Sequence, residues 1–297
     1  MTEKNDNKDY LVILAGSPRG GEATWKTLYK NVIDELDADL AIFWNNEWNK
    51  KISLYSRANY RWIFDEPDDF KTYYEKKFSG NWREYFETGI DTGLHSSGLI
   101  HFVFKDIIKE KYLDVLSNYK FIIYTRFDQF YLDKHPAIQD SYLYIPEGED
   151  FFGLCDRHAV IPSPQSEDFF NICSYIDSKD SLVNIPEFNN CETTFLSHLQ
   201  SNGLVRKVRR FPRIQFTSTL KGEHTNWRVA KYKLYFYKNL MIKYPDEFID
   251  GVRNCVDQHS FLKFFFKKPF ITINYILLAI LRKIGKFKSN ENELYEW

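Results

Sequence analysis

The stretch that decides the fold is Tyr10-Leu-Val-Ile-Leu-Ala15, which is followed directly by Gly16-Ser-Pro-Arg-Gly-Gly21. The first segment is a continuous apolar run, which is typical of a strand buried on both faces of a parallel sheet. The second contains three glycines and a proline, a cluster that interrupts regular structure. Residues 22–36 then place apolar side chains at helical spacing, and Leu40-Ala-Ile-Phe-Trp44 has the pattern of a second strand. This order predicts the beginning of an α/β domain with a parallel sheet.

Further along the chain, helical and strand patterns alternate. The expected segments are helices at 96–116 and 187–202, strands at 119–124 and 211–217, a short strand with a glycine-containing turn at 142–153, and loops with short helices at 45–90. We therefore predict an α/β fold in which helices flank a mostly parallel sheet.

Composition narrows the functional classes. The chain has 297 residues, of which 43% are hydrophobic, and its 40 basic residues are balanced by 41 acidic ones. A wholly basic nucleic-acid coat is therefore not expected, and we predict no nucleic-acid partner. Aromatic residues make up 18% of the chain, a surplus that suits sugar faces and membrane interfaces as well as a core. Residues 1–9 have no apolar secretory core, and the four cysteines form no CxxC pair, so we expect a cytoplasmic protein with reduced thiols.

The last part of the chain has a different pattern. From Phe261 to Ser289 there are seven basic residues and no acidic one, and the apolar segment Pro269–Leu281 between them is too short to span a bilayer. Such a segment suits a helix that lies in the lipid headgroup region, on the inner face of a membrane. The alternative is a C-terminal helix packed on the core. We predict a catalytic domain at 1–230 and a helical, membrane-associating tail at 231–297.

The glycine-rich turn is the first candidate site. A turn between a buried strand and a helix presents backbone N–H groups and a positive helix end to an anion, and Arg19 adds a charged fork for phosphate. The spacing of Gly16 and Gly21 is close to that of a P-loop. However, Glu22 and Ala23 stand where the lysine and the hydroxyl residue should be, so a Walker-type ATPase is not expected. The alternative is a plain tight turn.

The next candidate lies at the end of the strand 119–124. Arg126 and Asp128 project to the same side, at the place where ligands bind in α/β sheets. Asp128 is a candidate ligand for a divalent cation, and Arg126 is a candidate for holding phosphate or orienting Asp128. A salt bridge with no role in function is the alternative.

Two further segments carry charged side chains. Asp156 and Arg157 belong to a dense group of ionisable residues at 146–158, which is more typical of a site than of a solvated surface. Glu192 lies at the start of a predicted helix. A carboxylate there either acts as a general base or only caps the N-terminal end of the helix. His224 follows the last predicted strand.

Taken in order, these motifs resemble the GT-A-like glycosyltransferases of surface-polysaccharide synthesis, such as lipopolysaccharide and capsule enzymes and their relatives in large algal viruses. The motifs are Leu14-Ala-Gly-Ser-Pro-Arg-Gly-Gly21, Tyr124-Thr-Arg-Phe-Asp-Gln-Phe-Tyr131, Pro146-Glu-Gly-Glu-Asp150, Gly153-Leu-Cys-Asp-Arg-His158, and Glu192 followed by Leu199-Gln-Ser-Asn-Gly203. The resemblance implies a Rossmann-type sheet and transfer of a sugar from a nucleotide-diphosphate sugar to a glycan or lipid-linked acceptor.

The resemblance also assigns roles. Donor contacts would come from Gly16, Ser17, Arg19, Gly20, Arg126, Asp128, Gly153 and Arg157. Glu192 matches the catalytic acidic position, and Asp156 is a second candidate base. Asp128 and His224 match the ligands of a divalent metal, Mn or Mg, but Arg126 occupies the first acidic position of the metal motif. Arg126 would then supply part of the positive charge at the diphosphate.

Two other functions remain open from the sequence. The turn with Thr24-Trp25 also looks like the phosphosulfate-binding loop of sulfotransferases, although Glu22 would repel the phosphates of that nucleotide. The third hypothesis is a peripheral membrane scaffold that binds glycans without catalysis.

Overall fold

The computed structural model describes residues 8–45, 50–88, 97–225, 232–237 and 239–285. Contacts divide the chain into two compact units. Unit 1 comprises the chain up to Gly16, Asp37–Thr125 and Ile138–Phe211, and unit 2 comprises Ser17–Leu36, Arg126–Ala137 and the chain from Pro212 onward. The functional division into a catalytic domain and a membrane-associating tail stays a prediction.

Unit 1 is built on a seven-stranded sheet. In their order across the sheet, the strands are β3 (Tyr60–Phe64), β2 (Asp39–Asn45), β1 (Tyr10–Ala15), β4 (Phe121–Arg126), β7 (His158–Pro162), β6 (Leu143–Pro146) and β8 (Val208–Phe211). β1 is parallel to β2, β2 to β3 and β6 to β8, whereas β7 is antiparallel to both of its neighbours. The predicted α/β class, with a mostly parallel sheet flanked by helices, is confirmed at this level.

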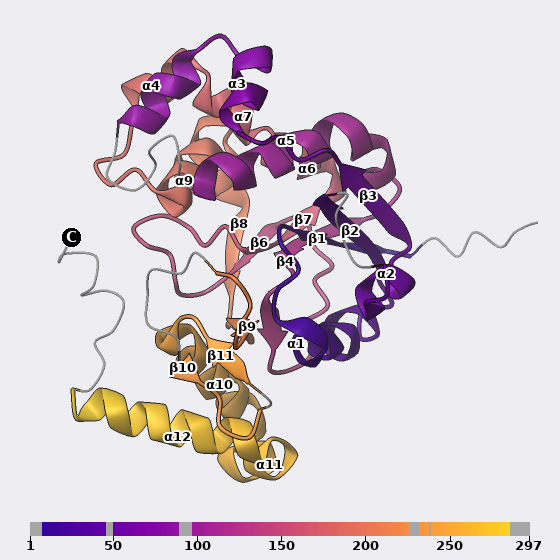
Figure 1. Ribbon diagram of the computed structural model, residues 1–297, viewed down its shortest axis with the longest axis vertical. Coiled ribbons are helices and arrows are strands. Elements are labelled where there is room, and N and C mark those ends of the chain that lie inside the picture. Colours follow the sequence, from indigo (N-terminus) through magenta and orange to yellow (C-terminus); the bar gives the residue numbers. More distant parts are fainter. Residues whose placement is uncertain (1–7, 46–49, 89–96, 226–231, 238, 286–297) are drawn as a thin grey trace, which may run out of the picture. The chain divides into compact units, whose positions relative to one another are not determined.

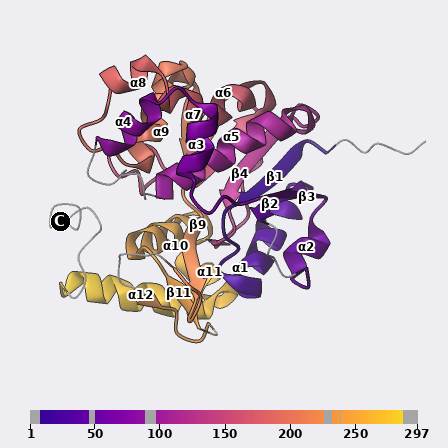
Figure 2. The same ribbon diagram turned by 45° about the horizontal axis from the view of Figure 1, so that its top comes forward.

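One face of this sheet carries the main core. The side chains of Leu11, Ile13 and Ala15 alternate along β1 and share one buried cluster with the helices, as the two-residue period of a strand requires. The helices of unit 1 are α2 (Ser53–Arg57), α3 (Lys71–Lys77), α4 (Asn81–Glu87), α5 (Ser97–Leu116), α6 (Ser166–Phe170), α7 (Ile172–Ile176), α8 (Lys179–Val183) and α9 (Cys191–Ser201), with short 3₁₀ turns at Ser163–Gln165 and Leu204–Lys207. Figures 1 and 2 show α3, α4, α5, α7 and α9 gathered on one side of the sheet and α2 on the other.

Unit 2 contains a four-stranded sheet. Its strands, in order, are β10 (Tyr232–Lys233), β11 (Leu240–Ile242), β9 (Gln215–Leu220) and β5 (Gln129–Tyr131), and its helices are α1 (Gly21–Leu28), the π-helical turn η1 (Tyr29–Ile33), α10 (Pro245–His259), α11 (Phe261–Lys267) and α12 (Pro269–Lys283). All three strand pairs are antiparallel. Helix α1 packs against β5 and β9, α10 packs on β9, and α11 and α12 pack on α10.

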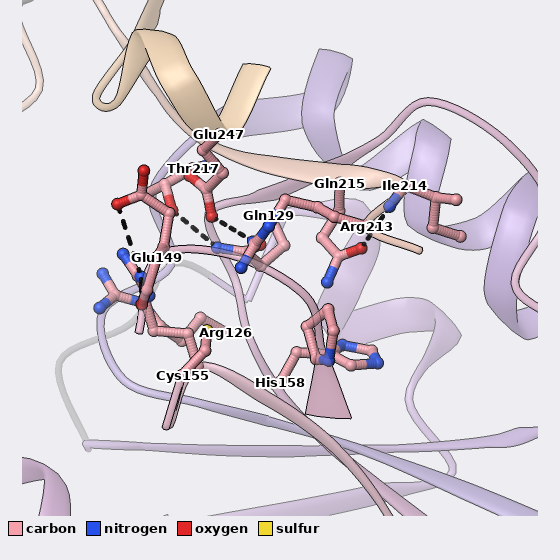
Figure 3. A network of polar contacts seen from close by, with 12 residues as sticks. Arg126, Gln129, Glu149, Cys155, His158, Arg213, Ile214, Gln215, Thr217 and Glu247 are labelled. Atoms are coloured by element: carbon pink, nitrogen blue, oxygen red, sulfur yellow. Dashed lines mark hydrogen bonds and ion pairs between the residues drawn. The ribbon is translucent and has the colours of Figure 1, made fainter. Parts of the chain in front are cut away.

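A buried polar network joins β5, β9 and α10 (Figure 3). Arg213 donates to Glu247 Oε1 at 2.6 Å, and the backbone N–H of Thr217 donates to Glu247 Oε2 at 2.7 Å. The amide of Gln129 donates to the Thr217 hydroxyl at 2.9 Å. Because the Arg213 and Glu247 side chains are only 2% and 0% exposed, each charge depends on the other for compensation, and the network fixes α10 on the sheet.

The structure differs from the predicted elements in several places. The helix expected at 22–36 is α1 followed by η1, and the helix expected at 187–202 begins at Cys191. The strand expected at 211–217 is two strands, β8 and β9, which Pro212 separates because proline has no N–H for a ladder. Within the described ranges, no helix is both long and apolar enough to cross a membrane.

Candidate functional site

The glycine-rich turn is held by a carboxylate from a distant segment. Gly20 precedes α1 in a left-handed conformation, with φ of 89°, which glycine adopts without steric cost. Its N–H donates to Glu223 Oε2 at 2.9 Å, and the same oxygen accepts from the Leu220 N–H and the Thr219 hydroxyl, each at 2.7 Å. The Gly20 N–H, which the resemblance assigned to a phosphate of the donor, therefore already donates to a carboxylate oxygen.

Arg126 and Asp128 form a two-point ion pair. Arg126 donates from Nε to Asp128 Oδ1 at 2.9 Å and from Nη2 to Oδ2 at 2.6 Å. Burial alone would raise the pKa of Asp128, but Arg126, Lys243 and Arg19 together hold that pKa below its ordinary value. Arg19 of the turn thus lies within electrostatic reach of Arg126 and Asp128 at the end of β4.

Charged side chains of both signs gather here. Arg19, Arg126 and Lys243 act on Asp128, and Glu223 acts on Arg19, so three cations and two carboxylates lie within electrostatic reach of one another. Burial and the neighbouring Arg126 both lower the pKa of Arg19, while the two carboxylates raise it. Three cations gathered at a partly buried position can contact an anionic ligand. We call these five residues the cationic cluster.

The residues present do not fit the predicted metal. Both carboxylate oxygens of Asp128 are engaged by the Arg126 guanidinium, so a divalent cation would have to displace a positive group that is already bound. His224 is exposed and makes no hydrogen bond or ion pair with any other described residue. In the part of the chain that the structure describes, no group of three or more His, Cys, Asp or Glu residues is arranged to hold a metal.

A second group of predicted residues lies in unit 1, in the loop before β7. Three non-glycine residues of this loop have positive φ angles, Glu149 at 55°, Phe151 at 42° and Phe152 at 68°. Strained backbone of this kind persists only where surrounding contacts impose it, and it is common at functional sites. Asp150 imposes much of it, since its carboxylate accepts from Arg210 at 2.9 Å and 3.0 Å and from the Cys155 N–H at 3.0 Å.

Arg157 lies between two carboxylates. Its Nη2 atom donates to the Glu149 carbonyl at 3.0 Å and lies 3.9 Å from Glu149 Oε2 and 4.0 Å from Glu192 Oε1. The helix cap of α9 is Asn190, which forms a capping box with Thr193. Glu192 is therefore not the cap, and its side chain, only 14% exposed, is directed to Arg157.

Gly153 explains how the loop reaches α9. A Cβ atom built on Gly153 would lie 2.1 Å from the backbone of Glu192 and 2.4 Å from the Thr193 nitrogen. Only a glycine permits this approach, and the Leu154 N–H donates to the Glu192 carbonyl at 3.1 Å. Packing thus accounts for Gly153, whereas the sequence assigned it to the donor sugar.

Lys105 is a residue that the sequence reasoning missed. It is fully buried on α5, and its Nζ atom has no hydrogen-bond partner among the described residues. Four aromatic rings surround it, at 4.6–5.6 Å: Phe102, Tyr124, Phe169 and Phe195. Burial lowers its pKa, while Asp156 and Glu192 oppose that shift, so Lys105 lies within electrostatic reach of both predicted bases. The sequence does contain an indication of this residue: Lys105 and Asp106 are two charged residues inside an otherwise apolar stretch of the helix.

The predicted residues therefore fall into two groups. Arg19, Gly20, Arg126 and Asp128 gather in unit 2, while Gly153, Asp156, Arg157 and Glu192 gather in unit 1. Gly16 is the last residue of the first segment of unit 1. Ser17 is the first residue of unit 2, and its side chain is exposed. No protein-family model matches this chain, and no curated protein matches it at a significant level.

Proposed function

We propose that this protein is a glycosyltransferase that moves a sugar from a nucleotide-diphosphate donor to a hydroxyl of a growing glycan or lipid-linked acceptor. The observation that carries the proposal is the cationic cluster, in which Arg19 and Asp128 come from the segments that follow β1 and β4 in the chain. Residues that follow the strands of open α/β sheets are the usual source of ligand contacts. A GT-A-like identity of the fold is part of the same proposal.

The chemistry follows from the charge. Sugar transfer leaves a nucleoside diphosphate whose negative charge grows as the glycosidic bond breaks, and fixed cations stabilise that charge. Arg19 and Lys243 would contact the departing diphosphate, while Asp128 holds the Arg126 guanidinium in one orientation. No step is assigned to a metal, because the carboxylate expected to bind it is already paired.

The acceptor hydroxyl must lose a proton in an inverting reaction. Glu192 and Asp156 remain the proposed bases. Arg157 Nη2 lies 4.0 Å from Glu192 Oε1 and orients this carboxylate, and a glutamine in its place would keep the shape but could not accept the proton. Glu192→Gln should therefore lower the turnover number more than the donor affinity.

Neither alternative is favoured by a specific contact. In the sulfotransferase hypothesis, a hydroxyl near the turn faces the nucleotide. Here the Thr24 hydroxyl is buried and lies 2.9 Å from the Ser218 hydroxyl, and Glu22 is exposed in the first turn of α1. A scaffold without catalysis would be insensitive to neutralisation of Glu192.

The test is donor binding by thermal shift, with uridine and guanosine diphosphate sugars and with the phosphosulfate nucleotide. A donor at about 100 times its Kd should add about 2.7 kcal/mol of stability. Arg19→Gln should weaken binding about tenfold or more, the usual effect of removing a charged hydrogen bond. Replacing Arg126 or Asp128 alone is less informative, because it leaves a buried charge unpaired and costs about 3–5 kcal/mol.

The matched control is Arg253→Gln, which removes an exposed arginine whose partner is Asp250 on the same helix. It should leave the donor shift unchanged. An equal shift in Arg19→Gln and wild type would contradict the assignment of the cationic cluster. A larger shift with the phosphosulfate nucleotide than with any nucleotide sugar would favour the sulfotransferase.

A further inference from the structure

Exposed apolar side chains are concentrated on one part of unit 2. Of the thirteen large apolar side chains exposed in the described part of the chain, ten lie between residues 235 and 284. They are Tyr235, Phe236, Phe261, Leu262, Phe266, Phe270, Ile276, Leu277, Ile280 and Ile284. We call these ten residues the apolar face. Scattered exposed apolar residues need no explanation, but a gathered set marks an interaction surface.

Helix α12 presents two different sides. Ile271, Asn274 and Leu278 are buried at helical spacing, where α12 packs on α10. Phe270, Leu277 and Ile284 recur every seven residues and are 46%, 40% and 58% exposed, so they share another side, next to the buried one. Figures 1 and 2 show α12 along the outside of unit 2, with α10 and β11 to one side of it. Packing on the core therefore uses only half of the helix.

The turn between β10 and β11 extends this face. Asn274 accepts from the Tyr235 N–H at 2.8 Å and donates to the Tyr235 carbonyl at 3.1 Å. The ring of Phe236, 71% exposed, lies 5.3 Å from that of Phe270. A buried asparagine thus holds two exposed aromatic residues beside α12, and Phe236 keeps a positive φ of 65° in doing so. The exposure of these rings is imposed by structure.

The charges around the face are positive. Asp133 is paired with His259 and Lys267, and Asp246 is paired with Arg282. No acidic residue occurs between Phe261 and Gly285. Lys263 and Lys283 are exposed and make no ion pair with any described residue. Lys286 and Lys288, counted in the sequence pattern, lie outside the described residues.

We propose that the apolar face, with Lys263 and Lys283 at its flanks, lies in the headgroup region of a bilayer that contains anionic lipid. Apolar side chains would enter the acyl boundary, and the lysines would meet lipid phosphates. A second copy bound through the same face about a twofold axis would bring the positively charged flanks of the two copies together, which disfavours a dimer. The proposal is independent of sugar transfer.

The test must leave the buried side of the tail unchanged. Removing residues 261–297 would also remove Phe264, Ile271 and Leu278 from the core, and the protein would lose stability for that reason alone. The informative variant therefore changes only the outer side, with glutamine, a good helix former. We choose the combination Leu262→Gln, Phe266→Gln, Leu277→Gln and Ile280→Gln. The matched control is Ile63→Gln with Val183→Gln, two exposed apolar residues of unit 1.

The experiment is flotation of the full chain with vesicles of phosphatidylcholine, with and without phosphatidylglycerol. Wild type and control should float with the anionic vesicles, and less so at higher salt, because salt screens the attraction. The fourfold variant should lose flotation while its melting temperature stays at the wild-type value. Equal flotation of the variant, or no flotation of the wild type, would overturn the proposal.

A variant that lacks only the two lysines separates the electrostatic contribution to vesicle binding from that of the apolar side chains. Lys263→Gln with Lys283→Gln should weaken binding to anionic vesicles roughly 30-fold, from about 1 kcal/mol for each charge. Lys111→Gln with Lys179→Gln removes two exposed lysines of unit 1 and should have no effect. If ultracentrifugation instead shows a wild-type dimer that the fourfold variant splits, the face is a contact between copies and the membrane proposal fails.

Discussion

Two buried histidines make stability depend on pH. Burial lowers the pKa of His135 and of His198 from 6.5 to about 4. In the unfolded chain each histidine binds its proton near pH 6.5, so between pH 6.5 and 4 the unfolded state holds more protons. We predict that the free energy of unfolding falls as pH drops through this range, by up to about 1.4 kcal/mol per pH unit for each histidine. Urea unfolding at a series of pH values measures it.

The substitutions that check this keep each hydrogen bond. His198 donates from Nε2 to the Asp168 carbonyl at 2.9 Å, which a glutamine amide can reproduce, and His135 donates from Nδ1 to the Pro136 carbonyl at 2.8 Å, which suits asparagine. His198→Gln and His135→Asn should each flatten the pH dependence above pH 4.5. The lowered pKa of Asp128 acts below 3.8 and does not interfere. An unchanged slope in both variants would show that other groups cause the loss.

At the scale of single elements, contacts within one segment were predictable and contacts between distant segments were not. The long apolar runs of β1 and β4 identified both strands, and the spacing of Arg126 and Asp128 placed them together at a strand end. Glu223, by contrast, accepts a hydrogen bond from the Gly20 N–H, which lies 203 residues away in the sequence. No local sequence pattern encodes that pairing. β7 was missed because its five buried residues begin with a histidine and end with a proline.

The contact of the 146–158 loop with α9 gives the prediction at this scale. Gly153→Ala would force a Cβ atom into the backbone of Glu192, where neither side can yield as a side chain would. We expect a loss of about 1–3 kcal/mol or more in the free energy of unfolding, together with displacement of the Arg157–Glu192 pair. The free energy of unfolding, measured with a chemical denaturant, and the turnover number should fall together.

Gly251→Ala is the comparison that isolates backbone from side-chain crowding. Its Cβ would lie 2.9 Å from a Leu132 methyl group, which can rotate away, and alanine gains about 1 kcal/mol of helix propensity inside α10. Stability should therefore change little. A Gly153→Ala protein as stable as Gly251→Ala would mean that the loop moves away from α9 at no cost.

At the scale of the whole molecule, the chain passes between the two units at five places: after Gly16, Leu36, Thr125, Ala137 and Phe211. All seven strands of the larger sheet end at or before Phe211, whereas β5 needs β9 as its partner. Unit 2 is therefore assembled from three separate pieces of sequence. Its two earlier pieces, Ser17–Leu36 and Arg126–Ala137, pack on each other through α1 and β5, but β9, on which both of them pack, belongs to the last piece.

This arrangement predicts the behaviour of a fragment that stops at residue 211. The sheet of unit 1 should form in that fragment, while the two earlier pieces of unit 2 keep only their contact with each other and lack β9, which completes their packing in the full chain. Trypsin should then cut faster at Lys26 and Lys30, which lie in α1 and η1 in the full chain. Mass spectrometry of timed digests identifies the cuts. Equally fast cleavage at Lys120, next to β4, would show that unit 1 does not fold without the rest.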